Sequence, residues 1–165
     1  TGVCTKTYYM VSKADADGVV SEWYEGNNTR AISIAITKPD PKADLYVSSM
    51  SGVPASATVG ASISVTDTTN KSLCATGAST TRIYLSNNAD GYAGIEIGSG
   101  RTVAAFTSNP GAQTDSGSIT GTIPSGCLGS CYITVKSDAD GAITEWYEGN
   151  NNKGTAIAIT IPQYQ

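Results

Sequence analysis

The chain has 165 residues, of which 15% are charged, and its formal net charge is -4. This length allows one good hydrophobic core rather than two of ordinary size. There is no basic run to neutralise phosphates, and no apolar stretch approaches the roughly 20 residues that span a bilayer. The composition therefore excludes nucleic acid as a partner and insertion into a membrane.

The most informative feature of the sequence is an internal repeat in which each residue corresponds to the one 123 positions later. The repeat runs without a gap from Cys4 and Cys127 to Pro39 and Pro162. Self-similarity at a fixed period is typical of modular arrays. The chain is therefore predicted to hold one full repeat unit and the last third of another.

The first 39 residues are predicted to form an extra β-hairpin, a partial repeat of the last two strands of the module. Its strands are expected at Tyr8 to Lys13 and at Arg30 to Thr37, where alternating isoleucines give the second strand an apolar face. A two-stranded ribbon is marginal in water, and its open edges attract another chain. The hairpin is thus expected to need a partner, which is either a neighbouring repeat or another copy of the chain.

The prolines of Lys38-Pro-Asp-Pro-Lys42 predict a short stiff linker that ends at residues 40–43, and the domain is predicted over residues 44–165. Short alternating β-branched segments between Gly, Asn, Asp and Pro clusters predict an all-β fold. The expected architecture is an immunoglobulin-like antiparallel β-sandwich of about seven strands. These strands are expected around Leu45–Val47, Ile63–Val65, Ile83–Leu85, Ile95–Ile97, Ser116–Ile123, Tyr132–Lys136 and Thr155–Ile161, the last with Ile157, Ile159 and Ile161 on one face.

Several motifs occur in a characteristic order: Ala43-Asp-Leu-Tyr-Val-Ser-Ser, Pro54-Ala-Ser-Ala-Thr-Val-Gly60, Ile83-Tyr-Leu-Ser86, Ile97-Gly-Ser99 and Asp138-Ala-Asp-Gly…Glu145-Trp-Tyr-Glu148-Gly-Asn-Asn151. In this order they resemble the CARDB family, the cell-adhesion-related domain found in bacteria, over residues 43–162, with residues 4–39 as a second partial copy. The resemblance implies an immunoglobulin-like sandwich in secreted or surface proteins, often in tandem, and it supplies no activity. The Trp-Tyr pair departs from the small or polar residues usual there, which favours a contact surface over a pure spacer.

The four cysteines indicate an exported protein with disulfides, because their number is even, no histidine is present and no spacing is typical of zinc sites. Free buried thiols are the alternative. A start at Thr1 rather than Met fits a processed chain on the outside of a cell. Cys127–Cys131 is expected as a local loop disulfide. Cys4–Cys74 is the hypothesis for the other pair, with an intersubunit bond through Cys4 as its rival.

Two acidic loops are candidate calcium sites, because four carboxylates brought together by a hairpin repel one another without a cation. Calcium takes six to eight oxygen ligands in flexible geometry. The alternative is that Asp-Gly and Asn-Asn simply form turns, with the carboxylates in water. The predicted ligands are Asp15, Asp17, Glu22, Glu25 and Asn27 in the first copy, and Asp138, Asp140, Glu145, Glu148 and Asn150 in the second.

The adjacent aromatic residues in each acidic loop allow three roles, as core anchors, as a protein interface or as a platform for sugars. Because side chains of adjacent residues alternate in direction, only one of each pair can point inward, and burial of the tryptophan is expected in the core role. Aromatic residues are also typical interface anchors. The predicted interface residues are Tyr8, Tyr9, Val11, Trp23, Tyr24, Trp146 and Tyr147.

An enzymatic role is not expected, since the chain has no histidine for acid–base chemistry and no Gly-rich phosphate loop. The sequence instead predicts an extracellular structural subunit that assembles head to tail into a filament by β-strand addition, stabilised by calcium and disulfides. Self-association is the expected partnership. The alternative is an adhesion, spacer or glycan-binding module from a tandem-repeat bacterial surface protein.

Overall fold

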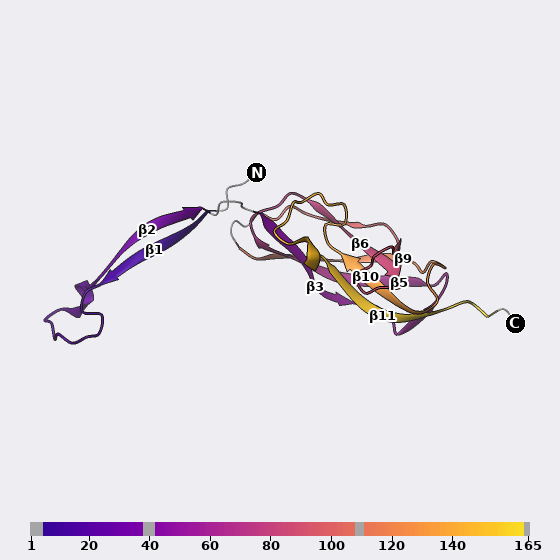
Figure 1. Cartoon of the computed structure of the whole chain (residues 1–165), viewed down its shortest axis with the longest axis horizontal. Helices are drawn as coiled ribbons and strands as arrows, with labels where there is room; N and C mark the ends of the chain where they lie inside the picture. The colour runs from indigo at the N-terminus through magenta and orange to yellow at the C-terminus, as the bar shows by residue number, and fades with distance from the viewer. Residues whose placement is uncertain (1–4, 38–41, 108–110, 164–165) are drawn as a thin grey trace.

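The computed structural model describes residues 5–37, 42–107 and 111–163, and strands dominate it (Figure 1). The strands are β1 Thr5–Lys13, β2 Thr29–Thr37, β3 Ala43–Ser51, β4 Ser56–Thr58, β5 Ser62–Leu73, β6 Ser79–Ser86, β7 Ile95–Glu96, β8 Arg101–Val103, β9 Gln113–Thr122, β10 Gly129–Lys136 and β11 Asn152–Thr160. Within the described ranges, the helical turns η1 (Glu25–Asn27) and η2 (Glu148–Asn150) have three residues each, and neither could cross a membrane.

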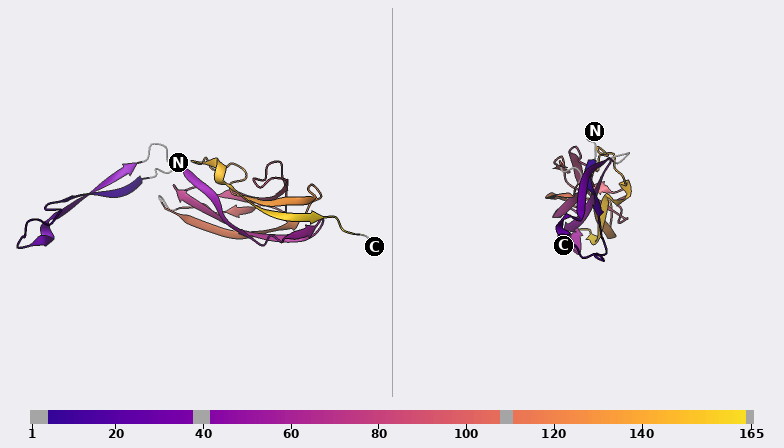
Figure 2. Two further views of the ribbon diagram at one scale, coloured as in Figure 1. Left: turned by 60° about the horizontal axis from the view of Figure 1, so that its bottom comes forward. Right: turned by 90° about the vertical axis from the view of Figure 1, so that its left-hand side faces the viewer.

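Strands β3 to β11 form the predicted all-β sandwich from two sheets. One sheet has the order β3-β5-β9, and the other has the order β4-β11-β10-β6-β7, with β8 also paired to β6. Figure 2 shows the two layers facing each other along the length of the domain. The fold class predicted from the alternating sequence is therefore confirmed.

The core of the sandwich is built from the alternate residues that each strand turns inward. On β5 the pattern exposed–buried recurs along the strand, so that Ile63 and Val65 are buried while Ser62, Ser64 and Thr66 face solvent. Ile133 and Val135 of β10 and Ile157 of β11 meet them from the other sheet in one hydrophobic cluster. The β-branched residues noted in the sequence thus fill the space between the sheets.

Three strands depart from the prediction, and one of them is β8, a short strand that was not expected. β4 was not expected, because its three residues lack an alternating apolar pattern, yet it pairs in parallel with the end of β11. Ile161 was expected on the inner face beside Ile157 and Ile159, but it lies beyond the end of β11 and is exposed. The pairing of β11 ends at Thr160, so nothing directs the next side chain inward.

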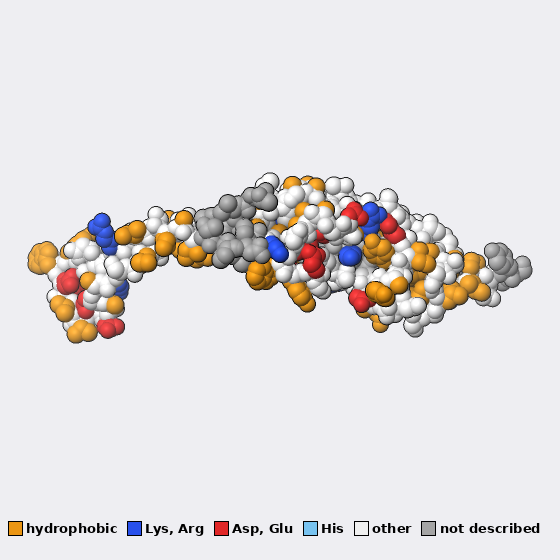
Figure 3. All heavy atoms as spheres, turned by 45° about the horizontal axis from the view of Figure 1, so that its top comes forward, with side chains coloured by type: hydrophobic (Ala, Val, Ile, Leu, Met, Phe, Trp, Pro, Cys, Tyr) orange, Lys and Arg blue, Asp and Glu red, His pale blue; other side chains and the backbone are white. Residues whose placement is uncertain are grey.

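The extra hairpin is present, and its β1 and β2 pair antiparallel with Tyr8 opposite Ile34 and Met10 opposite Ile32. These residues and Ile36 lie on one face of the ribbon, which we call the isoleucine face. Every large side chain on that face is exposed, by 41% for Ile34 and up to 68% for Met10. Figure 3 shows hydrophobic side chains along the hairpin, which stands apart from the sandwich in Figure 1.

Candidate functional site

The loops of the two hairpins have the same conformation. We call residues 14–28 the hairpin loop and residues 137–151 the docking loop. Asp15 and Asp138 both adopt left-handed backbone angles, with φ of 45° and 43°. In each loop the first residue donates a backbone hydrogen bond of 2.9 Å to the asparagine that ends the loop, Asn28 or Asn151. The same sequence therefore folds alike with and without a sandwich around it.

The aspartates hold both loops in shape through their carboxylates. Asp138 accepts hydrogen bonds from the backbone N–H groups of Ala142 and Ile143 at 3.1 and 2.9 Å. Asp15 accepts the equivalent bonds from Val19 and Val20 at 2.9 and 3.1 Å. Each loop thus satisfies its own backbone locally, which explains why its geometry does not depend on packing.

In the sandwich, the docking loop binds the beginning of β3. Glu145 and Ala43 form a parallel β-bridge, and the backbone N–H of Trp146 donates to the carbonyl of Ala43 at 2.8 Å. The carboxylate of Glu145 accepts a hydrogen bond from the backbone N–H of Leu45. The loop therefore extends the sheet by one short parallel contact and caps its first strand.

Side chains reinforce this contact on both sides of the bridge. Asn150 donates a hydrogen bond of 2.9 Å to the carboxylate of Asp44, and Asn151 donates one of 2.9 Å to Glu145. Ile143 packs against a small hydrophobic cluster whose members are Leu45, Val103 and Phe106. The docking loop is thus fixed by one apolar contact and by polar contacts to three successive residues of β3.

Glu145 pays an electrostatic cost for its position. It is only 4% exposed, and burial raises its pKa to about 7, although the hydrogen bonds from Leu45 and Asn151 favour the ionised form. Nearby Glu148 and Asp138 raise the pKa further by repulsion. A buried carboxylate with an elevated pKa makes the contact between the loop and β3 sensitive to pH.

The hairpin loop carries the same docking residues without a β3 beside them. Glu22, Asn27 and Asn28 are identical to Glu145, Asn150 and Asn151, and Val20 replaces Ile143. Val20 is 58% exposed, and Asn28 donates to Glu25 at 3.1 Å rather than to Glu22. The hairpin loop therefore presents a ready docking geometry to solvent.

The fold of the sandwich is similar to that of solved structures. No protein-family model matches the chain, and no curated protein matches its sequence. A crystal structure of the CARDB domain of a Pyrococcus furiosus protein, in complex with di-metal ions, aligns over 76% of this chain and 100% of its own, with 15% identity and a TM-score of 0.52. A solution structure of the same domain aligns over 73% of this chain and 97% of its own, with a TM-score of 0.47.

The sandwich has the CARDB fold. This confirms the resemblance drawn from the sequence motifs. At 15% identity the likeness concerns the fold, and the metal ions belong to the Pyrococcus protein.

The predicted calcium ligands of the CARDB-like domain do not converge. Asp138 binds its own loop, Glu145 binds β3, and Asp140 forms an ion pair with Arg82 at 3.1 Å. Glu148 accepts a hydrogen bond of 3.0 Å from the backbone of Glu145, as Glu25 does from Glu22. In the described ranges no three His, Cys, Asp or Glu residues form a group that could hold a metal ion.

This arrangement does not fit a calcium site, although the carbonyl oxygen of the Asn150 side chain is buried and lacks a hydrogen-bond partner among the described residues. The other copy is no different, since Asp17, Glu22, Glu25 and Asn27 are exposed and Asp15 binds its own loop. Calcium binding stays a prediction that these positions do not favour.

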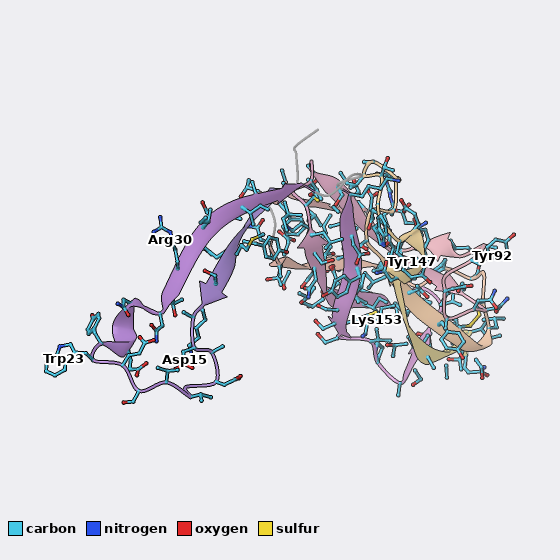
Figure 4. All side chains as sticks on the ribbon, turned by 60° about the vertical axis from the view of Figure 1, so that its left-hand side comes forward. Asp15, Trp23, Arg30, Tyr92, Tyr147 and Lys153 are labelled. Carbon is cyan, nitrogen blue, oxygen red and sulfur yellow. A yellow bond between two sulfur atoms is a disulfide. The ribbon has the colours of Figure 1, made fainter. Side chains whose placement is uncertain are left out.

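The expectation that tryptophan is the buried member of each aromatic pair is wrong. Trp146 is 57% exposed and Tyr147 is 60% exposed, and in the hairpin loop both Trp23 and Tyr24 are exposed. Figure 4 shows Trp23 at the tip of the hairpin, pointing away from it. The inward position is occupied by Glu145, whose bridge to Ala43 turns the next side chain outward.

The predicted disulfide Cys127–Cys131 is present and closes the turn before β10. Cys74 is buried in the loop after β5, and there is no free cysteine in the described part of the chain. Cys4 lies outside the described residues, so the pairing Cys4–Cys74 stays a prediction.

Sequence reasoning did not identify the roles of Asp44 and Leu45, the residues of β3 that the docking loop binds. Asn151 and Ile143 of the docking loop were also given no role in the sequence analysis, which named their neighbour Asn150 as a candidate calcium ligand. One signal in the sequence could have pointed to these contacts. Glu-Trp and Asn-Asn are identical in the two copies, and identical loops are expected to bind the same kind of strand.

Proposed function

We propose that this chain is a non-enzymatic structural module of an extracellular end-to-end assembly, in which the β1–β2 hairpin completes a neighbouring CARDB-like sandwich. The observation that carries the proposal is the contrast between equivalent residues of the two hairpins. Ile34 is 41% exposed while its counterpart Ile157 is 3% exposed, and Ile36 is 50% exposed while Ile159 is 1% exposed. The hairpin therefore has the apolar face that packs into the core in the β10–β11 hairpin, but here that face is exposed to solvent.

Physical arguments support a role in assembly. A contiguous exposed apolar face of this kind marks an interaction surface, and an isolated ribbon is marginal in water. A disulfide such as Cys127–Cys131 is typical of proteins in oxidising surroundings, in keeping with an extracellular location. Head-to-tail self-association into a filament, the form predicted from the sequence, is one such assembly. Calcium is left out of the proposal because its predicted ligands do not converge.

Hydrogen exchange measured on the native material and on the isolated chain tests this proposal. The amides of β1 and β2 are expected to be protected in the native assembly and to exchange fast in the isolated chain, while β10 and β11 are protected in both. Fast exchange of β1 and β2 in both samples would rule out a hairpin-based assembly.

A second candidate function is glycan binding, which the exposed pair Trp146 and Tyr147 favours, since exposed aromatic rings can stack on sugars. A glycan-binding screen compares the chain with Trp146→Ala, and the matched control is Tyr92→Ala, an exposed aromatic residue outside both loops. Glycan binding that is lost in Trp146→Ala and kept in Tyr92→Ala would support this function. The absence of glycan binding in all three chains would dismiss it.

A further inference from the structure

The contacts of the docking loop identify the partner that the hairpin loop fits. This step rests on the proposed function and names the neighbour that the hairpin completes. In the sandwich, Glu145 caps the backbone of Leu45, and Asn150 donates to Asp44. The equivalent residues Glu22 and Asn27 are identical in type and sit in a loop with the same backbone geometry.

The hairpin loop needs little rearrangement to receive such a strand: Asn28, which donates to Glu25, has to turn to Glu22 as Asn151 does to Glu145. The side-chain carboxylate of Glu22 makes no hydrogen bond within the described residues, while Glu25 accepts from the backbone of Glu22 as Glu148 does from Glu145. Val20 is exposed at the position where Ile143 packs against the hydrophobic cluster that contains Leu45. A preformed site loses little conformational entropy when it binds.

The chain's own sandwich cannot be the partner. If β1–β2 replaced β10–β11 there, Thr37 would take the place of Thr160, at the far end of β11 from the docking loop. That end lies about 30 Å along the strand from the start of β3, at roughly 3.3 Å a residue. The five residues between Thr37 and Ala43 reach about 21 Å when fully extended, which is too short.

A sandwich that keeps its own closing hairpin has no place for β1–β2. The described residues hold two hairpins of this type, β1–β2 and β10–β11, and one set of strands β3 to β9, where β10–β11 already occupies the place of the hairpin. The partner must supply acceptor strands that come without a hairpin of their own.

We propose that the hairpin loop and the isoleucine face together form a receptor for a CARDB-like sandwich that lacks its own closing hairpin. The first strand of that sandwich begins with a small residue, an aspartate and an aliphatic residue, as Ala43, Asp44 and Leu45 do here. The aspartate pairs with Asn27, the backbone N–H of the aliphatic residue is capped by Glu22, and the core of the partner covers Ile34 and Ile36.

Two positions show where this partner differs in shape from residues 42–126. A Cβ atom at Gly154 would lie 2.2 Å from the carbonyl oxygen of Ala89, and the hairpin has Ala31 at that position. The loop of the partner that corresponds to residues 87–93 must therefore keep further away. Tyr8 replaces Cys131 on the core face, so the partner also needs more room there.

The test is a spliced chain in which residues 42–126 are placed before residues 4–165, so that Gly126 joins Cys4 as it joins Cys127 in the natural sequence. A second version carries Tyr8→Cys and Ala31→Gly, which remove these two differences from the β10–β11 hairpin. Amide exchange in residues 29–37 is expected to slow by about two orders of magnitude relative to the 165-residue chain, since exposed strands become part of a closed core.

Matched variants of the spliced chain separate the receptor from general crowding. Ile34→Ser and Asn27→Ala are expected to restore fast exchange in residues 29–37, completely for the first and about tenfold for the second. Val11→Thr, on the opposite face of the hairpin, should leave exchange slow. Protection in either version supports the proposal, and fast exchange in both overturns it. If the native assembly protects the hairpin while both spliced versions fail, the assembly role stands and this partner is wrong.

Discussion

Asn150 donates a hydrogen bond of 2.9 Å to Asp44, a residue 106 positions earlier in the chain. This bond joins the loop between the last two strands of the sandwich to its first strand. The equivalent residue of the other copy, Asn27, lies in a loop of the same shape where no such strand is present. One interaction thus distinguishes a docked hairpin from an undocked one.

Asp44→Ala is expected to lower the free energy of unfolding of the sandwich by about 1–2 kcal/mol, because Asp44 also accepts a bond of 3.1 Å from Ser72. Urea unfolding of the 165-residue chain measures the loss. Asn27→Ala is the matched control, since the same residue type in the hairpin loop supports no contact with β3. Equal losses in the two variants would show that the bond does not stabilise the docked loop.

Arg101 of β8 is expected to be the most sensitive charged residue of the fold. Its guanidinium pairs with Asp67 of β5 at 2.6 Å and with Asp115 of β9, so it connects the two sheets. Asp67 is 2% exposed, and removal of its partner leaves a buried carboxylate uncompensated. Arg101→Met should cost about 3–5 kcal/mol in the free energy of unfolding.

Arg82 provides the control for Arg101. It pairs with Glu96 at 2.7 Å and with Asp140, but both pairs lie at the surface. Arg82→Met should therefore change stability far less than Arg101→Met, because exposed ion pairs are screened by water and salt. Thermal unfolding of the two variants side by side checks the order, and a larger loss in Arg82→Met would contradict it.

The stability of the sandwich should fall as the pH rises from about 4.5 to about 7. Burial raises the pKa of Glu145 to about 7 from an ordinary value of 4.5, so the folded state holds this proton more tightly than the unfolded chain does. A group of this kind stabilises the fold at low pH, and the stabilisation is lost as the pH rises through its folded pKa.

Glu145→Gln should remove that dependence on pH. The new amide faces Asn151, whose side-chain oxygen has no hydrogen-bond partner among the described residues and can accept from it after a flip. Urea unfolding at several pH values measures the difference from the natural chain, and Glu22→Gln, in the exposed loop, is the control. The prediction is contradicted if, relative to Glu145→Gln, the free energy of unfolding of the natural chain increases as the pH rises from about 4.5 to about 7.

Chelation should leave the chain unchanged. Bound calcium at about 100 times its Kd would add about 2.7 kcal/mol to the stability of the folded state, a shift of several degrees in Tm. Because the predicted ligands do not converge, Tm is expected to be the same with calcium and with excess chelator. If chelator lowered the Tm of the natural chain but not that of Asp138→Asn, the calcium site at the docking loop would be reinstated.

The fold was predictable because its signals are local. Alternation at Ile63 and Val65 or at Ile157 and Ile159 defines strands without knowledge of their partners. The repeat added the equivalence of the two hairpins, which no single segment reveals. β4 had neither kind of signal, since it is defined only by its pairing with β11.

The site was predictable in location but not in chemistry. Sequence reasoning singled out the acidic loops, yet sequence spacing could not show that each carboxylate of the docking loop binds a different partner. Glu145 faces inward because of Ala43, which is about a hundred residues away. A contact of that range decides whether a glutamate binds a metal or caps a strand, and whether its neighbour Trp146 is buried.

The long reach of the docking contact has a consequence for synthesis of the protein. Strands β3 to β9 leave the ribosome before the 32 residues from Gly129 to Thr160 that close them. At 5–20 residues a second, the nascent sandwich stays open for about 2–6 s. Any prefolded hairpin of the same design can close it first. In the proposed assembly, hairpins that can replace one another could also close the wrong sandwich, and fast translation through this segment would be the simplest protection.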